Sequence, residues 1–148
     1  MYEIGDKTII IKKVLKEKYR SKIIEESKVE FSIHSPAKII DYNCIKNGAS
    51  FKGRIETVMN ILGSKSKLPV PILPKKGIYM FPTSSMKNAD CMFLSYYHIE
   101  KYSPYGKFAN IQFKDKSHIL VKTSFNQLDL QMKRTSQVIA YYTKLLYL

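Results

Sequence analysis

Hydrophobic and polar positions near the start of the chain follow the patterns that β-strands require. Residues 8–14 are β-branched and apolar, and residues 28–34 alternate polar and apolar side chains, as a half-buried strand does. Residues 20–26, with Ile23-Ile24 between charges, fit either a strand or a turn of helix, and we favour the strand. The beginning of the chain is therefore predicted to form strands.

The pattern changes to helical signals after residue 34. Ser35-Pro36 predicts a helix start, because serine caps free amide groups and proline suits the first helical position. A helix over roughly 36–46 should end near Asn47-Gly48, where glycine accepts the left-handed conformation that closes helices. A second helix ending near Gly63 is predicted from an apolar stripe at helical spacing: Phe51, Ile55, Val58, Met59 and Leu62.

The remaining chain combines a proline-rich segment, several short strands and a last helix. Residues 65–76 hold three prolines and four lysines, which predicts an exposed, fairly stiff loop. Aromatic and branched residues predict antiparallel strands at 77–82, 92–95, 97–102, 108–113 and 118–122. Ser124-Phe125-Asn126-Gln127 has capping-box spacing and opens a helix to about Leu146, whose apolar face favours core over a dimer seam.

These elements predict a single α+β domain spanning residues 1–148, in which a mostly antiparallel sheet packs with two central helices and a long C-terminal helix. Its 45% hydrophobic residues suffice for a core. The two cysteines, Cys44 and Cys91, have neither zinc-site nor disulfide spacing, so we expect reduced thiols. The apolar runs are far shorter than the roughly 20 residues that span a bilayer. Early acidic residues and Lys12-Lys13 also argue against a secretory leader, so we expect a cytoplasmic protein without a membrane partner.

Charge then points to a class of partner. The net charge is +13, and residues 46–88 hold eight basic side chains against one acidic one, whereas residues 1–45 hold nine against seven. Such an excess suits a polyanion, above all nucleic acid. With 22 lysines and only three arginines, however, much of the charge could be ordinary solvated lysine, so charge alone does not decide the function.

Enzymatic chemistry has little support in the sequence. His34, His98 and His118 all fall in predicted strands without motif spacing, which favours structural or surface roles. Nucleophile elbows, phosphate-binding loops of Walker type, dinucleotide fingerprints and zinc-protease helices are all absent. We therefore expect a protein that is not an enzyme, with no catalytic residue, no metal site and no cofactor.

Residues 44–54 stand out because they mix small residues with hydroxyl, amide and cationic side chains: Asn47, Gly48, Ala49, Ser50, Lys52, Gly53 and Arg54. A turn of this kind lets backbone amides approach phosphates while an arginine projects into a groove. The alternative is that the two glycines merely join two helices.

Three blocks carry a resemblance to a known family. The first runs from Ile39-Ile40-Asp41-Tyr42-Asn43-Cys44 to Gly48-Ala49-Ser50-Phe51-Lys52-Gly53-Arg54, and the second is Ile78-Tyr79-Met80-Phe81-Pro82-Thr83-Ser84-Ser85, followed by Cys91 and Ser95-Tyr96-Tyr97-His98. The third is Ser124-Phe125-Asn126-Gln127 leading to Gln131, Arg134 and Thr135. With Ser21-Lys22-Ile23-Ile24-Glu25 before them, the blocks cover most of the chain and resemble the ComK competence transcription factors of Gram-positive bacteria.

The resemblance implies an activator of competence (DNA uptake) genes that binds paired AT-rich boxes, chiefly through the minor groove, as a multimer. A narrow AT-rich minor groove attracts inserted arginine, so we assign Arg54 to it, beside Lys52, Gly53, Asn47 and Ser50. Phosphate contacts are assigned to five lysines, namely Lys46, Lys65, Lys67, Lys75 and Lys76. Thr83, Ser84 and Ser85 are either hydrogen-bond donors to phosphate or a strand-end turn.

Departures from the family pattern leave several points open. Ala49 replaces a serine, and the chain has no tryptophan. Longer members continue past the position of Leu148 into a tail recognised by an adaptor of the Clp protease, so binding of that adaptor stays open, as does contact with RNA polymerase. Two other functions also remain: an RNA or single-strand binder that stacks bases on its Tyr- and Phe-rich strands, and a protein-interaction domain whose charge is incidental.

Overall fold

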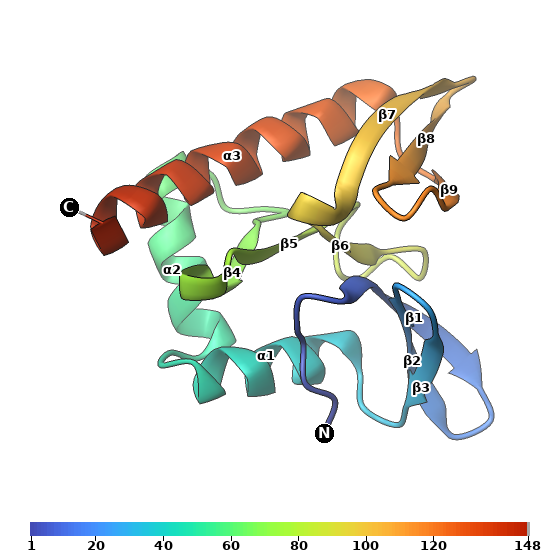
Figure 1. Ribbon diagram of the computed structural model, residues 1–148, viewed down its shortest axis with the longest axis horizontal. Coiled ribbons are helices and arrows are strands. Elements are labelled where there is room, and N and C mark those ends of the chain that lie inside the picture. Colours follow the sequence, from blue (N-terminus) through green and yellow to red (C-terminus); the bar gives the residue numbers. More distant parts are fainter. Residues whose placement is uncertain (148) are drawn as a thin grey trace.

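Two antiparallel sheets form the framework of the protein in the computed structural model, which describes residues 1–147 (Figure 1). The larger sheet has the order β3-β2-β1-β6-β5-β4 and the smaller one the order β7-β8-β9. The strands are β1 (Thr8–Lys16), β2 (Tyr19–Glu25), β3 (Val29–Ser32), β4 (Val70–Leu73), β5 (Ile78–Pro82), β6 (Met92–Ser95), β7 (Ile99–Tyr105), β8 (Phe108–Phe113) and β9 (His118–Val121). The helices are α1 (Pro36–Lys46), α2 (Phe51–Leu62) and α3 (Phe125–Tyr147). The predicted α+β class is confirmed.

The larger sheet consists of two three-stranded halves joined at its centre. The joining ladder pairs Ile10 with Leu94, Ile11 with Phe93 and Lys12 with Met92. On one face, Ile11 and Ile23 pack with Ile39 and Ile40 of α1. On the other face, the smaller sheet and Leu128 of α3 pack against the larger sheet. Figure 1 accordingly shows α1 and α3 on opposite sides of the larger sheet.

Local capping explains why all three helices begin where the sequence predicts. The Ser35 hydroxyl accepts a hydrogen bond from the Lys38 amide at 3.2 Å, and the Ser50 hydroxyl accepts one from the Gly53 amide at 3.0 Å. Ser124 caps α3 in the same way, through the Gln127 amide at 3.1 Å. α2 ends at Gly63, whose φ of 62° is left-handed. Buried Leu128, Val138 and Tyr142 confirm that the apolar face of α3 is core, whereas Leu148 lies outside the described residues.

The prediction of an exposed loop at 65–76 was wrong for residues 68–73. Val70, Pro71 and Ile72 are buried in β4, and residues 74–76 form a short 3-10 turn, η1 (Pro74–Lys76). Proline is tolerated here because β4 is the edge strand of its sheet. On the outer side of an edge strand there is no neighbouring strand to accept a backbone N–H, so the N–H that proline lacks is not needed there. The prolines therefore mark a sheet edge.

The predicted strand at 97–102 also begins later than expected, because a 3-10 turn, η2 (Tyr96–His98), precedes β7. His98 consequently lies in a turn and His34 lies after β3, so the prediction that both are strand residues was wrong, whereas His118 does lie in β9. The 3-10 turn redirects the chain from the larger sheet into the smaller one.

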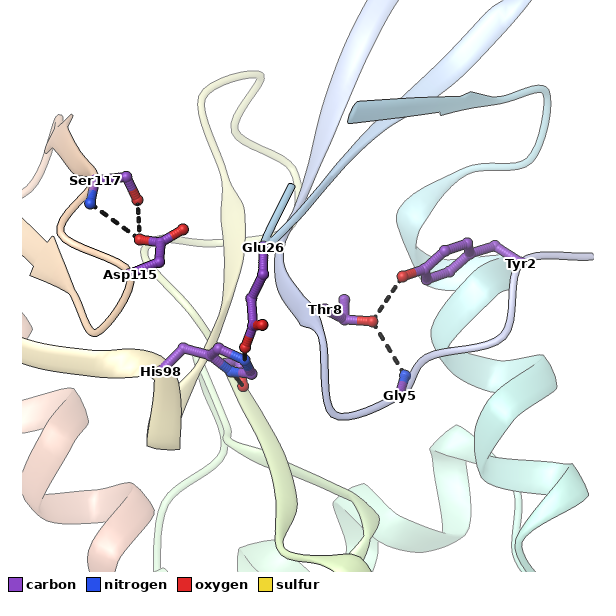
Figure 2. A network of polar contacts seen from close by, with 8 residues as sticks. Tyr2, Gly5, Thr8, Glu26, His98, Asp115 and Ser117 are labelled. Atoms are coloured by element: carbon purple, nitrogen blue, oxygen red, sulfur yellow. Dashed lines mark hydrogen bonds and ion pairs between the residues drawn. The ribbon is translucent and has the colours of Figure 1, made fainter. Parts of the chain in front are cut away.

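His98 connects the two sheets through its side chain and backbone. Its Nδ1 lies 2.8 Å from the Ser95 hydroxyl, and its Nε2 lies 3.4 Å from a Glu26 carboxylate oxygen. Its carbonyl accepts a hydrogen bond from the Lys114 amide at 2.9 Å. Figure 2 shows the imidazole directed at Glu26, with the Thr8 hydroxyl network at the start of β1 nearby. These contacts give His98 a structural role.

A buried side-chain amide on α3 binds the loop before β4 and the end of β5. Gln131 is 3% exposed, and its Nε2 donates to the Lys67 carbonyl at 2.9 Å and the Pro82 carbonyl at 2.7 Å. Its Oε1 accepts a hydrogen bond from Arg134 at 2.8 Å, and Arg134 also donates to the Ser66 carbonyl at 2.8 Å. Burial lowers the pKa of Arg134, whose charge these acceptors offset. We call Gln131 and Arg134 the α3 anchor.

Replacing Gln131 with alanine should lower the free energy of unfolding by about 2 kcal/mol, because buried carbonyls lose their donors. Gln137→Ala is the matched control on the same helix, since Gln137 is exposed and its bond to the Ile61 carbonyl is long, at 3.4 Å. Urea denaturation monitored by circular dichroism measures both. Equal losses in the two variants would contradict the anchoring role.

Candidate nucleic-acid interface

A groove of about 590 Å³ lies between α2, the loop that follows it and the turn after β5. Apolar side chains contribute part of its lining, including Phe51, Ile55 and Phe93. Lys65, Lys67 and Lys87 line it as well. We call it the basic groove. An apolar surface with several cations around it is suited to a ligand that combines flat apolar groups with negative charge.

Tertiary contacts hold the two loops of the basic groove in place. The α3 anchor binds the carbonyls of Ser66 and Lys67, and Lys67 itself has a left-handed backbone, with φ of 52°. In the turn after β5, the Met86 carbonyl accepts a hydrogen bond from the Lys13 side chain, and the Ser85 hydroxyl accepts one from the Lys87 amide at 3.3 Å. The lysines are therefore carried by folded loops and not by flexible tails.

The predicted segment 44–54 forms the turn between α1 and α2, and much of its polarity is used within it. The Asn47 side-chain amide donates to the Asn43 carbonyl at 2.7 Å, and Ser50 caps α2 through the Gly53 backbone amide. The Phe51 amide donates to Asp41 at 2.9 Å. Lys52 is exposed on the first turn of α2. These hydrogen bonds stabilise the junction between α1 and α2, which agrees with the alternative interpretation that the two glycines join two helices.

Arg54, predicted to enter a DNA groove, lies folded against this turn. One terminal nitrogen, Nη2, donates to the Asn47 carbonyl at 2.7 Å, and its Nε is buried without a hydrogen-bond partner among residues 1–147. Cys44 lies beneath it, and burial raises the pKa of that thiol to about 11, while the Arg54 charge acts in the opposite direction. Arg54 would have to leave the Asn47 carbonyl to reach a ligand.

The other predicted contacts are dispersed. Lys46 is paired with Glu3, and Lys75 and Lys76 lie in η1, beside α3 and away from the lining of the basic groove. Thr83 is only 7% exposed, and its hydroxyl accepts a hydrogen bond from the Met92 amide at 3.1 Å, which is the geometry of a strand-end turn. Ser84 is half-buried, its hydroxyl lies 3.5 Å from the Ser85 carbonyl, and its own carbonyl accepts a hydrogen bond from the Cys91 thiol at 3.4 Å. Of the predicted residues, the groove brings together Lys65, Lys67 and Ser85.

Three cations missed at the sequence level extend this surface. A second hollow, of about 450 Å³, is lined by Lys13, Arg20 and Lys87, the last of which also lines the basic groove. Lys13 additionally donates to the Met86 carbonyl, which ties β1 to the same turn. Residues 12–22 hold six basic side chains and one acidic side chain, Glu17. This local excess of positive charge was missed because the count was made over residues 1–45, which contain six further acidic residues.

The comparisons with known proteins now identify the family. The family model described as ComK protein matches residues 1–145. The chain belongs to the ComK family. The competence transcription factor of Bacillus subtilis (strain 168) is 27% identical over 138 residues, which cover 91% of this chain and 71% of that protein. No solved structure matches the chain.

The ComK blocks noted in the sequence coincide with contacts that shape the interface. Asp41 of the first block caps the start of α2, and Gln131 and Arg134 of the third block form the α3 anchor. Thr135, also in the third block, is buried and bonds the Gln131 carbonyl. These residues position the loops of the ComK fold and do not themselves line the basic groove.

Two negative findings concern the described part of the chain. Within residues 1–147, no helix is long and apolar enough to cross a membrane. The same residues contain no cluster of three or more His, Cys, Asp or Glu side chains that could hold a metal ion.

The position of Arg54 generates a prediction about stability. Arg54→Ala should lower the free energy of unfolding by about 2 kcal/mol, because it removes a charge-assisted hydrogen bond from a partly buried carbonyl. Lys52→Ala is the matched control, two residues away on the same helix and exposed. Thermal or urea unfolding compares the two. An Arg54 variant as stable as the Lys52 variant would show that the guanidinium does not hold the turn.

Proposed function

We propose that this ComK-family protein is a transcription activator of competence genes that binds duplex DNA at AT-rich promoter sites, with residues 1–148 acting as a single DNA-binding domain. The observation that carries the proposal is the basic groove, in which Lys65, Lys67 and Lys87 surround an apolar surface on anchored loops. A net charge of +13 supplies long-range attraction for a polyanion. The B. subtilis relative, a competence transcription factor, supports the same function.

Phosphate binding is the role of the lysines in this proposal. Lys65, Lys67 and Lys87, with the exposed Ser85, contact the DNA backbone and supply affinity that depends strongly on salt. Because the α3 anchor holds the 64–68 loop before DNA arrives, little conformational entropy is lost on binding. The positive electrostatic field around the interface is the main contribution of the other predicted lysines, Lys46, Lys75 and Lys76.

Selectivity for AT-rich DNA is assigned to the minor groove, whose edge pattern chiefly separates A·T from G·C pairs. Asn47, Ser50, Lys52, Gly53 and Arg54 form the turn that we place against it. On binding, Arg54 exchanges its hydrogen bond with the Asn47 carbonyl for hydrogen bonds to acceptors in the DNA minor groove. Arginine is more weakly hydrated than lysine, which favours that exchange. Multimers of the chain then cover paired boxes.

Burial argues against the single-strand alternative. A stacking platform needs several aromatic faces open to solvent on one surface. Four strand aromatics are buried, namely Tyr79, Phe81, Phe93 and Phe113, and the two most exposed ones, Phe31 and Tyr105, lie in different sheets. The groove cations remain accessible to a duplex backbone. Duplex DNA is thus the favoured ligand.

The test is a fluorescence-anisotropy titration of a short duplex with paired A- and T-runs, against a GC-rich duplex of equal length, at two salt concentrations. The double variant Lys65→Ala/Lys67→Ala should bind the AT duplex at least about tenfold more weakly, with a salt slope lower by about 2. Lys75→Ala/Lys76→Ala removes the same charge outside the groove and should keep most of the wild-type affinity.

Three outcomes would count against the proposal. Equal, salt-sensitive binding to the AT-rich and GC-rich duplexes would show that the protein binds DNA only through its positive charge, without sequence selectivity. Preference for a single-stranded competitor would favour the stacking alternative. Equal losses in the two double variants would remove the groove from the interface and leave only a diffuse charge effect.

A further inference from the structure

The β1–β2 hairpin extends beyond the sheet that contains it. β1 pairs with β6 only as far as Lys12, and β2 pairs with β3 only from Ser21 onward. Between these points, residues 13–20 form a two-stranded ribbon closed by a turn at Glu17, whose φ is 58°. We call residues 13–20 the arm. Figure 1 shows this end of β1 and β2 projecting from the body of the protein at the lower right.

The arm is strongly basic. It carries Lys13, Lys16, Lys18 and Arg20 against a single acidic residue, Glu17. Within residues 1–147, none of these cations is in an ion pair. Lys16 and Lys18 lie over the rings of Phe31 and Tyr19, at 4.9 Å and 5.7 Å, which holds their stems along the ribbon. The arm therefore presents uncompensated positive charge along its length.

An apolar side chain stands among these charges. Leu15 is 90% exposed, and the pairing of β1 with β2 shifts register between Lys13 and Lys16, as at a β-bulge. A bulge bends its strand and redirects the side chain that it carries. A single exposed leucine needs no special explanation. Leu15, however, stands among the cations of the arm and lines the same hollow as Lys87.

We propose that the arm binds the minor groove of duplex DNA, with its cations along the phosphates and Leu15 pressed as a wedge between neighbouring base pairs. This inference rests on the proposed function and adds a second contact to it. Apolar wedges on basic elements that unstack a base step are a recurrent device of minor-groove binding. Lys87 lines both hollows, so one duplex running along this surface meets the arm and the basic groove together.

The experiment uses the full chain and an AT-rich duplex that contains 2-aminopurine, a base whose fluorescence rises when it is unstacked. Binding of the wild-type protein should raise this fluorescence. Leu15→Ser should abolish the rise and weaken binding by about tenfold, equivalent to about 1.4 kcal/mol. The matched control is Leu120→Ser, at a leucine that is 45% exposed on the smaller sheet, and it should behave as wild type.

A second variant tests the cations separately. Lys18→Ala/Arg20→Ala should lower the salt slope of binding by about 2, because two phosphate contacts are lost. Circular dichroism should show that both arm variants are folded, because Leu15, Lys18 and Arg20 are exposed.

The possible failures are distinguishable. If the wild-type protein binds the duplex but the fluorescence stays flat, or rises equally with Leu15→Ser, the arm is not a wedge and the proposed function still stands. Leu15-dependent binding to vesicles of anionic lipid, with no change in the 2-aminopurine signal, would overturn the proposal in favour of a membrane contact. If no duplex is bound at low salt, the proposed function fails and the arm proposal fails with it.

Discussion

The buried amide of Gln131 is the contact on which the proposed interface depends. Its two hydrogen atoms satisfy the carbonyl of Lys67, in the loop before β4, and that of Pro82, at the end of β5. An apolar side chain of the same size would leave both carbonyls without these donors. Arg134 completes the arrangement by fixing the orientation of the amide. The positions of Lys65, Lys67 and Ser85 relative to one another therefore follow from a side chain on α3 that does not line the basic groove.

Local signals in the sequence predicted most of the fold, because helix starts and ends are determined by neighbouring residues. Ser35, Ser50, Ser124 and Gly63 all act within one turn of their own position. The burial of β4 could not be predicted in this way, since Pro71 is acceptable only at the edge of a sheet whose strand order was unknown. The η2 turn was missed because aromatic composition does not distinguish a 3-10 turn from a strand.

The candidate site was predicted less completely, for the same reason. The charge pattern predicted Lys65 and Lys67 as phosphate contacts, and both line the basic groove to which we assign the DNA. Sequence could not show that Arg54 bonds the Asn47 carbonyl or that Thr83 is buried, because both depend on the three-dimensional turn. Lys13, Arg20 and Lys87 were overlooked because their segments are separate in sequence and meet only through the strand order of the larger sheet.

The short ladder between β1 and β6 also bears on how the protein folds. It pairs Lys12 with Met92, so more than half of the chain lies between the paired strands. Forming a contact at such separation is entropically costly, because a long loop must close before the ladder is made. The two halves of the larger sheet are local meanders that can form early, yet the arm and the turn at Lys87 belong to different halves. The surface assigned to DNA is thus continuous only once the β1–β6 ladder has joined the two halves, and a chain without that ladder has no continuous binding surface.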